Sequence, residues 1–239
     1  MNTKKIEGKK VPIIAHRGVS GLEKENTNAA FVAAGNRSYF GIETDVHVTL
    51  DGGLVIIHDD DTGRVAKQKM VVEKTPFDVL RNMLLNDIDD IAGRSDLRIP
   101  TLQEYIRICK KYEKTGVLEL KNAFKEEDIE KVIAAIKKEN YLDHIIFISF
   151  HLGNMLYLRK ALPKQPCQFL AKSCDDMVLQ ELARNRLDLD VDSQWLTKER
   201  IAKCHDMGIK VNCWTVDDPK TAAKFIDWGV DYITTNILE

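Results

Sequence analysis

Short apolar runs alternate with amphipathic segments along the whole chain. Runs rich in β-branched residues predict strands at 12–15, 40–46, 116–120, 145–149, 167–170, 187–191, 209–213 and 230–234, with an extra extended piece at 54–57. Helical periodicity predicts helices at 26–36, 101–113, 126–139, 152–161, 175–185, 197–207 and 218–228. Strands that alternate with helices are typical of a parallel sheet covered by helices. The length of 239 residues suits an α/β fold with one (β/α)8 barrel, a TIM barrel.

One interval, at about 59–100, contains no clean strand–helix unit. It holds turn signals, the acidic run 87–90 and the short apolar patch Met83-Leu84-Leu85. Long loops in compact domains usually serve function. We therefore expect a single domain over 1–239, with an insertion that follows the second strand and rises over the barrel mouth. A separate small structural flap is the alternative.

Five candidate catalytic and metal-binding side chains stand at the ends of predicted strands. They are His16, Glu43, Asp45, His58 and Glu119. In a parallel barrel the carboxyl ends of the strands meet at one mouth, where active sites lie. Two imidazoles beside three carboxylates are suited to acid–base chemistry around a divalent cation, and phosphoester cleavage is a natural use of such a set.

Glu43 and Asp45 alternate along one predicted strand, so their side chains share one face. Two buried carboxylates repel each other, and a bound cation is a common remedy. Oxygen ligands favour Mg²⁺ or Ca²⁺, and Glu119 would complete the site. The alternatives are exposure at the barrel rim for the pair and a structural ion pair with Lys121 for Glu119.

Three further residues are candidates for substrate binding. Arg17 follows His16 directly and is able to hold a phosphate through two parallel hydrogen bonds. Lys121 would face the phosphate as a point charge, and Trp214 would form an apolar wall at the mouth. Asp59 either orients the His58 imidazole or only begins the loop.

The acidic residues between positions 188 and 199 have two possible interpretations. Asp188, Asp190 and Asp192, with Glu199 beyond them, match the acidic spacing of a calcium-binding EF-hand loop. However, Ser193 stands where that loop requires glycine, and the alternation with leucine and valine favours a strand. We therefore expect a barrel strand here.

Composition narrows the class of protein further. Hydrophobic residues make up 44% and charged residues 30%, and the net charge of −2 gives no reason to expect nucleic acid as a partner. No run approaches the ~20 apolar residues of an integral membrane segment. Residues 1–10 lack the apolar core of a signal peptide, so we expect a cytoplasmic location for the chain as given, or export if a leader has been removed. The five cysteines form no CxxC pairs and predict neither a disulfide framework nor a zinc site.

The residues described above lie within longer motifs, and with them the sequence resembles the glycerophosphodiester phosphodiesterase family. The matching segments run from about residue 12 to 236. They are IIAHRG (13–18), ENTNAAF (25–31), GIETDVHVT (41–49), DG (51–52), VIIHDDDT (55–62), IPTLQEY (99–105), LELK (118–121), VNCWTVDD (211–218) and GVDYITTN (229–236).

The resemblance implies roles for the residues already singled out. His16 and His58 would be the acid–base pair, and Glu43, Asp45 and Glu119 would hold one Mg²⁺ or Ca²⁺. Arg17 and Lys121 would bind phosphate, and Trp214 would line the substrate pocket. The chain departs from the family where Lys24 replaces a frequent proline, where Asp217 replaces a frequent asparagine, and where Thr235 and Asn236 stand near a frequent aspartate. These departures leave the identity of the leaving alcohol open.

The expected reaction is metal-dependent hydrolysis of a small-molecule glycerophosphodiester to glycerol 3-phosphate and an alcohol, by His/His catalysis through a cyclic phosphate. Direct attack by water is the alternative route. Two other functions stay open: lysophospholipase D-like action on lysophospholipids, which would need an exposed apolar groove on the insertion, and a barrel that binds phosphorylated ligands without turnover.

Overall fold

The eight predicted barrel strands form one closed parallel barrel. The computed structural model describes residues 2–8 and 11–239, so Met1, Lys9 and Lys10 of the N-terminal segment lie outside the described residues. The barrel strands are β1 (Ile13–Ala15), β2 (Gly41–Val48), β4 (Thr115–Leu120), β5 (Ile145–Ser149), β6 (Cys167–Ala171), β7 (Asp188–Asp192), β8 (Val211–Trp214) and β9 (Tyr232–Thr235). β1 pairs in parallel with both β2 and β9, which closes the barrel. The TIM-barrel prediction is confirmed.

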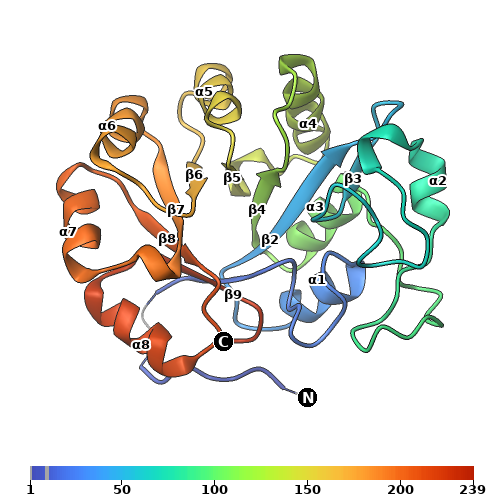
Figure 1. Cartoon of the computed structure of the whole chain (residues 1–239), viewed down its shortest axis with the longest axis horizontal. Coiled ribbons are helices and arrows are strands. Elements are labelled where there is room, and N and C mark those ends of the chain that lie inside the picture. The colour runs from blue at the N-terminus through green and yellow to red at the C-terminus, as the bar shows by residue number, and fades with distance from the viewer. Residues whose placement is uncertain (1, 9–10) are drawn as a thin grey trace.

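Helices lie outside the strands (Figure 1). They are α1 (Asn28–Gly35), α3 (Leu102–Lys111), α4 (Glu126–Lys138), α5 (Leu152–Ala161), α6 (Asp176–Asn185), α7 (Lys198–Asp206) and α8 (Pro219–Trp228), with short 3-10 turns η2 (Leu142–His144) and η3 (Ser193–Trp195). The predicted capping residues at the amino ends of two helices are confirmed. Thr101 and Glu104 form a capping box, and Asp218 caps α8 ahead of Pro219.

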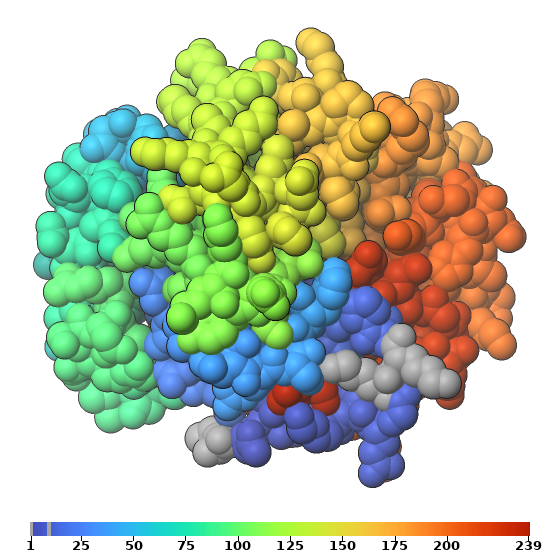
Figure 2. All heavy atoms as spheres, turned by 180° about the vertical axis from the view of Figure 1, so that it is seen from behind, coloured from blue at the N-terminus to red at the C-terminus, as the bar shows by residue number. Residues whose placement is uncertain are grey.

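The sequence segment 59–100 packs around a small apolar cluster of its own. This segment contains the 3-10 turn η1 (Val72–Lys74) and the short helix α2 (Phe77–Asn82), which periodicity did not predict. Leu80 of α2 packs with Val55 and Ile57, which belong to the extra strand β3 (Leu54–Ile56) and the residue after it. β3 pairs antiparallel with β2, and the segment forms one flank of the molecule (Figures 1 and 2).

The barrel interior holds a compact apolar layer. Ile14 of β1, Val117 of β4, Ile146 and Ile148 of β5, and Leu170 of β6 pack together there. A larger cluster lies between the strands and the surrounding helices. The interior layer forms a floor, so the space above it opens at the carboxyl ends of the strands.

The two ends of the chain lie side by side. Lys4 forms an isolated parallel bridge with Leu238, and the atoms of the two terminal segments adjoin in Figure 2. Within the described part of the chain, no helix has both the length and the apolar character that crossing a bilayer requires.

Candidate active site

A cavity of about 420 Å³ opens at the carboxyl ends of the strands. Every predicted site residue except Asp45 lines it; these residues are His16, Arg17, Glu43, His58, Glu119, Lys121 and Trp214. Asp45 is 1% exposed and lies beside the cavity, next to Glu119. The structure therefore brings all eight predicted residues to one mouth.

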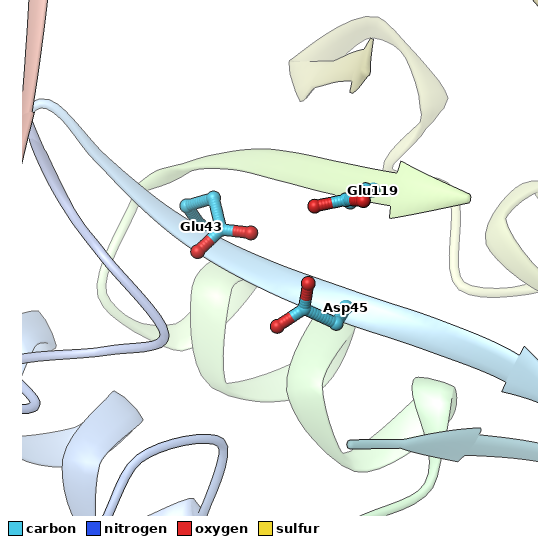
Figure 3. Close-up of side chains that lie close together, drawn as sticks. All are labelled: Glu43, Asp45 and Glu119. Carbon is cyan, nitrogen blue, oxygen red and sulfur yellow. The ribbon is translucent and has the colours of Figure 1, made fainter. Parts of the chain in front are cut away.

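The three carboxylates converge on one point. Asp45 on β2 is the direct register partner of Glu119 on β4, and Glu43 lies two residues before Asp45 on the same strand. One oxygen from each side chain lies within 4.8 Å of the other two, and the three groups point toward one another (Figure 3). All three side chains are buried. This spacing lets a single cation contact all three, because Ca²⁺ and Mg²⁺ bind oxygen at about 2.0–2.6 Å.

Burial and mutual repulsion set the charges of this cluster. Burial and the neighbouring Asp45 carboxylate raise the pKa of Glu119 to about 8 and that of Glu43 well above its usual value. Burial also acts to raise the pKa of Asp45, but Lys121 and the other nearby cations outweigh it and lower that pKa. Without a cation, Glu43 and Glu119 therefore tend to keep their protons, whereas Asp45 is ionised.

Two oxygens of the cluster have no hydrogen-bond donor among the described residues. They are Asp45 Oδ1 and Glu119 Oε1, both fully buried. Lys121 Nζ lies 3.3 Å from the first and 2.9 Å from the second, as ion pairs without good hydrogen-bond geometry. Buried polar atoms are nearly always hydrogen-bonded, so these two oxygens, which have the Lys121 charge nearby but no hydrogen bond, fit a divalent cation.

The turn after β1 positions Arg17 at the cluster. Arg17 and Gly18 both have positive φ, 55° and 76°, which gives the chain a sharp exit from the strand. A Cβ at Gly18 would lie 2.6 Å from the Ala30 side chain, so only glycine fits. The turn directs the Arg17 backbone N–H to Glu43 Oε2 at 2.8 Å, and Arg17 Nε lies 3.8 Å from Asp45 Oδ2.

Each candidate catalytic histidine has a partner on its Nδ1 atom. His16 Nδ1 lies 2.8 Å from Asn236 Oδ1, and His58 Nδ1 lies 2.6 Å from Asp59 Oδ1. Burial and the adjacent Arg17 charge lower the pKa of His16 to about 4. Burial also lowers the pKa of His58, although Asp45 and Asp59 act to raise it. Of the two readings of Asp59, the structure supports the one in which it orients the imidazole.

Sequence reasoning missed several polar partners of the site. Asn26 donates to Asp45 Oδ2 at 2.7 Å and accepts from the Thr44 hydroxyl. Its motif, ENTNAAF, is part of the family resemblance, but nothing in the neighbouring sequence indicates that the Asn26 side chain contacts Asp45 on β2. Asn236 is a departure from the family, and that departure does not indicate its contact with His16.

An ion-pair network joins the segment 59–100 to the barrel. Arg64 donates to both oxygens of Asp59 and both oxygens of Glu25, at distances of 2.6 to 3.1 Å. Glu25 also accepts from Arg17 Nη1 at 2.9 Å. Burial acts to raise the pKa of Glu25, but the two arginines outweigh it and hold that pKa at about 2. The network therefore connects a residue of the loop to groups beside both His58 and the acidic cluster.

Comparisons with known proteins agree with this site. The model of the glycerophosphoryl diester phosphodiesterase family matches residues 16–239. The chain belongs to this family. It is therefore an enzyme, a glycerophosphodiester phosphodiesterase.

Individual relatives of this phosphodiesterase cover nearly its whole length. The glycerophosphodiester phosphodiesterase of Bacillus altitudinis is 29% identical over 231 residues, which are 94% of each chain. A solved glycerophosphodiester phosphodiesterase from Parabacteroides distasonis is 26% identical, with a TM-score of 0.80 over 99% of this chain and 94% of that one. A phosphodiesterase from Oleispira antarctica, solved in complex with the product sn-glycerol-3-phosphate, is 25% identical, with a TM-score of 0.81 over 98% of this chain and 96% of that one.

Proposed function

We propose that this phosphodiesterase hydrolyses glycerophosphodiesters to glycerol 3-phosphate and an alcohol in a metal-dependent reaction, with His16 and His58 as the acid–base pair. The convergence of Glu43, Asp45 and Glu119 in the same cavity as both histidines carries this proposal. The product bound to the Oleispira antarctica relative supports the substrate class.

The three carboxylates would hold one Mg²⁺ or Ca²⁺. When bound, this ion would offset the negative charge of the phosphate and lower the pKa of a nearby hydroxyl. Arg17 and Lys121 line the same cavity and supply further positive charge for the phosphoryl oxygens. Arg17 keeps its charge throughout: burial acts to lower its pKa, but Asp45, Glu25 and Glu43 raise it further.

We assign the first proton transfer to His16. The Asn236 side chain donates through Nδ2 to Asp217 Oδ2 at 2.6 Å, so its Oδ1 atom faces His16 as an acceptor. The proton of a neutral His16 therefore lies on Nδ1, which leaves Nε2 free to accept one. With a pKa of about 4, His16 is neutral at physiological pH and able to take the proton of the glycerol 2-hydroxyl.

We assign protonation of the leaving alcohol to His58. The Asp59 carboxylate at Nδ1 is negatively charged and therefore stabilises the imidazolium form more strongly than an uncharged amide oxygen does. The negative charge of a bound diester would stabilise it further and counteract the effect of burial. The glycerol 2-oxygen attacks phosphorus, the alcohol leaves with the His58 proton, and a cyclic phosphate forms. Water then opens the ring with the histidines in exchanged roles.

We also propose that segment 59–100 is an insertion within a single domain that helps to form the mouth. Arg64 of this segment holds Asp59 and Glu25 together, as described above. The lysolipid alternative gains no support from the apolar patch of this segment. Leu85 is 3% exposed and Met83 packs against the same cluster, so Leu84, at 43% exposed, is left without the other two residues of the patch to form a groove.

The test is glycerol 3-phosphate release from glycerophosphocholine and glycerophosphoethanolamine, with Mg²⁺, with Ca²⁺ and with EDTA. We expect release that EDTA abolishes, and a loss of roughly 10²–10⁴-fold in turnover for His16→Ala and for His58→Ala. Near wild-type turnover in both variants would show that the assignment of the histidines is wrong. Ligand binding without any product would favour the non-catalytic barrel.

A further inference from the structure

A buried carboxyl group on β7 has an oxygen without a hydrogen-bond partner among the described residues. Asp190 is 2% exposed and lines the active-site cavity, and its Oδ1 atom makes no hydrogen bond within residues 2–8 and 11–239. Burial alone raises the pKa of this carboxyl, since no described charged side chain offsets it. An unpaired buried carboxyl is costly to the fold, so its retention in a cavity wall calls for a ligand.

Asp190 lies across the barrel from the acidic cluster. Around the closed sheet the strands follow the order β1, β2, β4, β5, β6, β7, β8, β9, which places β7 four strands from β2, and β8 four strands from β4. The strand β7, which carries Asp190, is therefore opposite β2, which carries Glu43 and Asp45 (Figure 1). The cavity lined by both walls would let one arm of a diester extend toward Asp190 when its phosphate lies at the cluster.

The wall around Asp190 is aromatic and apolar. Phe150 and Trp214 meet edge to face with ring centroids 5.8 Å apart, and Ile148 and Leu170 line the same cavity. The indole N–H of Trp214 donates to the backbone oxygen of Asp190 at 3.4 Å, which ties the ring to this strand. Phe150 is 38% exposed, so part of its ring is free to contact a ligand.

We infer that Asp190 determines specificity for the alcohol half of the substrate, by pairing with a positively charged amino group held against Phe150 and Trp214. This inference rests on the proposed function, because it takes the phosphate to lie at the acidic cluster. The favoured substrates are then diesters of amino alcohols, such as those of choline or ethanolamine.

The chemistry of the wall favours a cation over a neutral polyol. A carboxylate beside aromatic faces is the combination that binds ammonium groups. A polyol would need several hydrogen-bonding groups, whereas Thr215 and Thr234 are the hydroxyl-bearing residues of this lining. Lys172 lines the same cavity, but its side chain is exposed and leaves the Asp190 carboxyl without a countercharge.

The experiment compares kcat/KM for glycerophosphocholine with kcat/KM for glycerophosphoglycerol, whose leaving alcohol carries no charge. In Asp190→Asn we expect the ratio of the two to fall by about 10- to 100-fold, the effect of losing one charged interaction. Asp188→Asn is the matched control. Asp188 is on the same strand, but it lines a separate cavity with Lys210 and Tyr232. The Asp188→Asn variant should therefore have the same ratio of kcat/KM values as the unchanged protein.

A second measurement needs no variant. Free choline should competitively inhibit hydrolysis of glycerophosphoglycerol by the unchanged protein, and Phe150→Leu should weaken that inhibition. An equal fall for both substrates in Asp190→Asn would place the glycerol half at this wall and overturn the inference. So would an unchanged ratio, or the absence of inhibition by choline. If no diester is hydrolysed with either metal, the proposed function itself fails, which is a different result.

Discussion

The Nδ1 atom of His16 and the Oδ1 atom of Asn236 lie 2.8 Å apart, although 220 residues separate them in the chain. The Ser20 hydroxyl donates to the same Asn236 oxygen at 2.8 Å, and Asp217 accepts from the Asn236 amide group. The amide is thus held in one orientation from both sides. The hydrogen bond joins the first strand to the last and defines the protonated nitrogen of His16.

Removing this acceptor should slow the chemical step. We expect Asn236→Leu to lower kcat by roughly 10- to 100-fold with little change in KM, because the His16 ring loses its fixed tautomer and orientation. Steady-state kinetics on glycerophosphocholine measure both constants. Ser20→Ala is the control, since it removes a donor to the same oxygen but leaves the acceptor of His16 in place. Wild-type kcat in Asn236→Leu would contradict a positioning role.

The two histidines should respond differently to the leaving group. An alcohol of low pKa departs without a proton, so a p-nitrophenyl diester of glycerol 3-phosphate should largely rescue His58→Ala. His16→Ala should show no such rescue, because its proton transfer precedes departure of the alcohol. The comparison is the ratio of turnover on the two substrates for each variant. Rescue of His16→Ala instead of His58→Ala would reverse the assignment.

Metal binding should become tighter as the pH rises. Glu119, with its pKa raised to about 8, and Glu43, with its pKa also raised, hold protons that a divalent cation must displace. A carboxyl whose pKa is higher in the fold contributes stability that is full below its usual value of 4.5 and is lost as the pH rises through the folded value.

This linkage has a direct thermal test. The melting temperature of EDTA-treated protein should gain more from added Mg²⁺ or Ca²⁺ at about pH 8 than at about pH 5, and calorimetry should detect proton release on binding. Glu119→Gln should reduce both effects, since it removes one titrating ligand. An equal gain at both pH values in the unchanged protein would show that no protons are displaced.

The bridge made by Arg64 should depend on the shape of its guanidinium group. In Arg64→Lys we expect a fall in kcat of about tenfold, because one ammonium group does not bridge the Asp59 and Glu25 carboxylates in parallel pairs. Arg94→Lys is the matched control in the same segment, because Arg94 pairs with Glu23, Asp87 and Asp96 instead. Equal kinetics in the two variants would remove Arg64 from the site.

Local sequence patterns predicted much of this structure. The alternation of β-branched runs with helical periodicity predicted the barrel strands, and the boundary signals at Thr101 and Asp218 were confirmed. The helix α2 escaped prediction, because six residues are too few to be stable alone, and Leu80 holds them through contacts with β3.

Such patterns did not predict which side chains contact each other when they are far apart in the sequence. Asp190 was correctly placed on a strand, but its lack of a partner depends on what the neighbouring strands present to it. For the same reason the sequence assigned no contact to Arg64, which lies in the interval 59–100, or to Asn236, which was only a departure from the family. Their contacts depend on how the loops fold over the barrel mouth, and hydrophobic periodicity does not predict the path of a loop.

The sequence by itself determined the order of the barrel strands and of the helices between them, and the approximate end of each strand, because hydrophobic periodicity and capping are properties of neighbouring positions. Tertiary structure decided which of those residues meet. Closure of the barrel through β1, β2 and β9 joins His16 to Asn236 and brings β4 beside β2, so that Glu119 lies next to Asp45. The same closure sets Asp190 across the cavity from the acidic cluster, since a position around a ring exists only once the ring is closed.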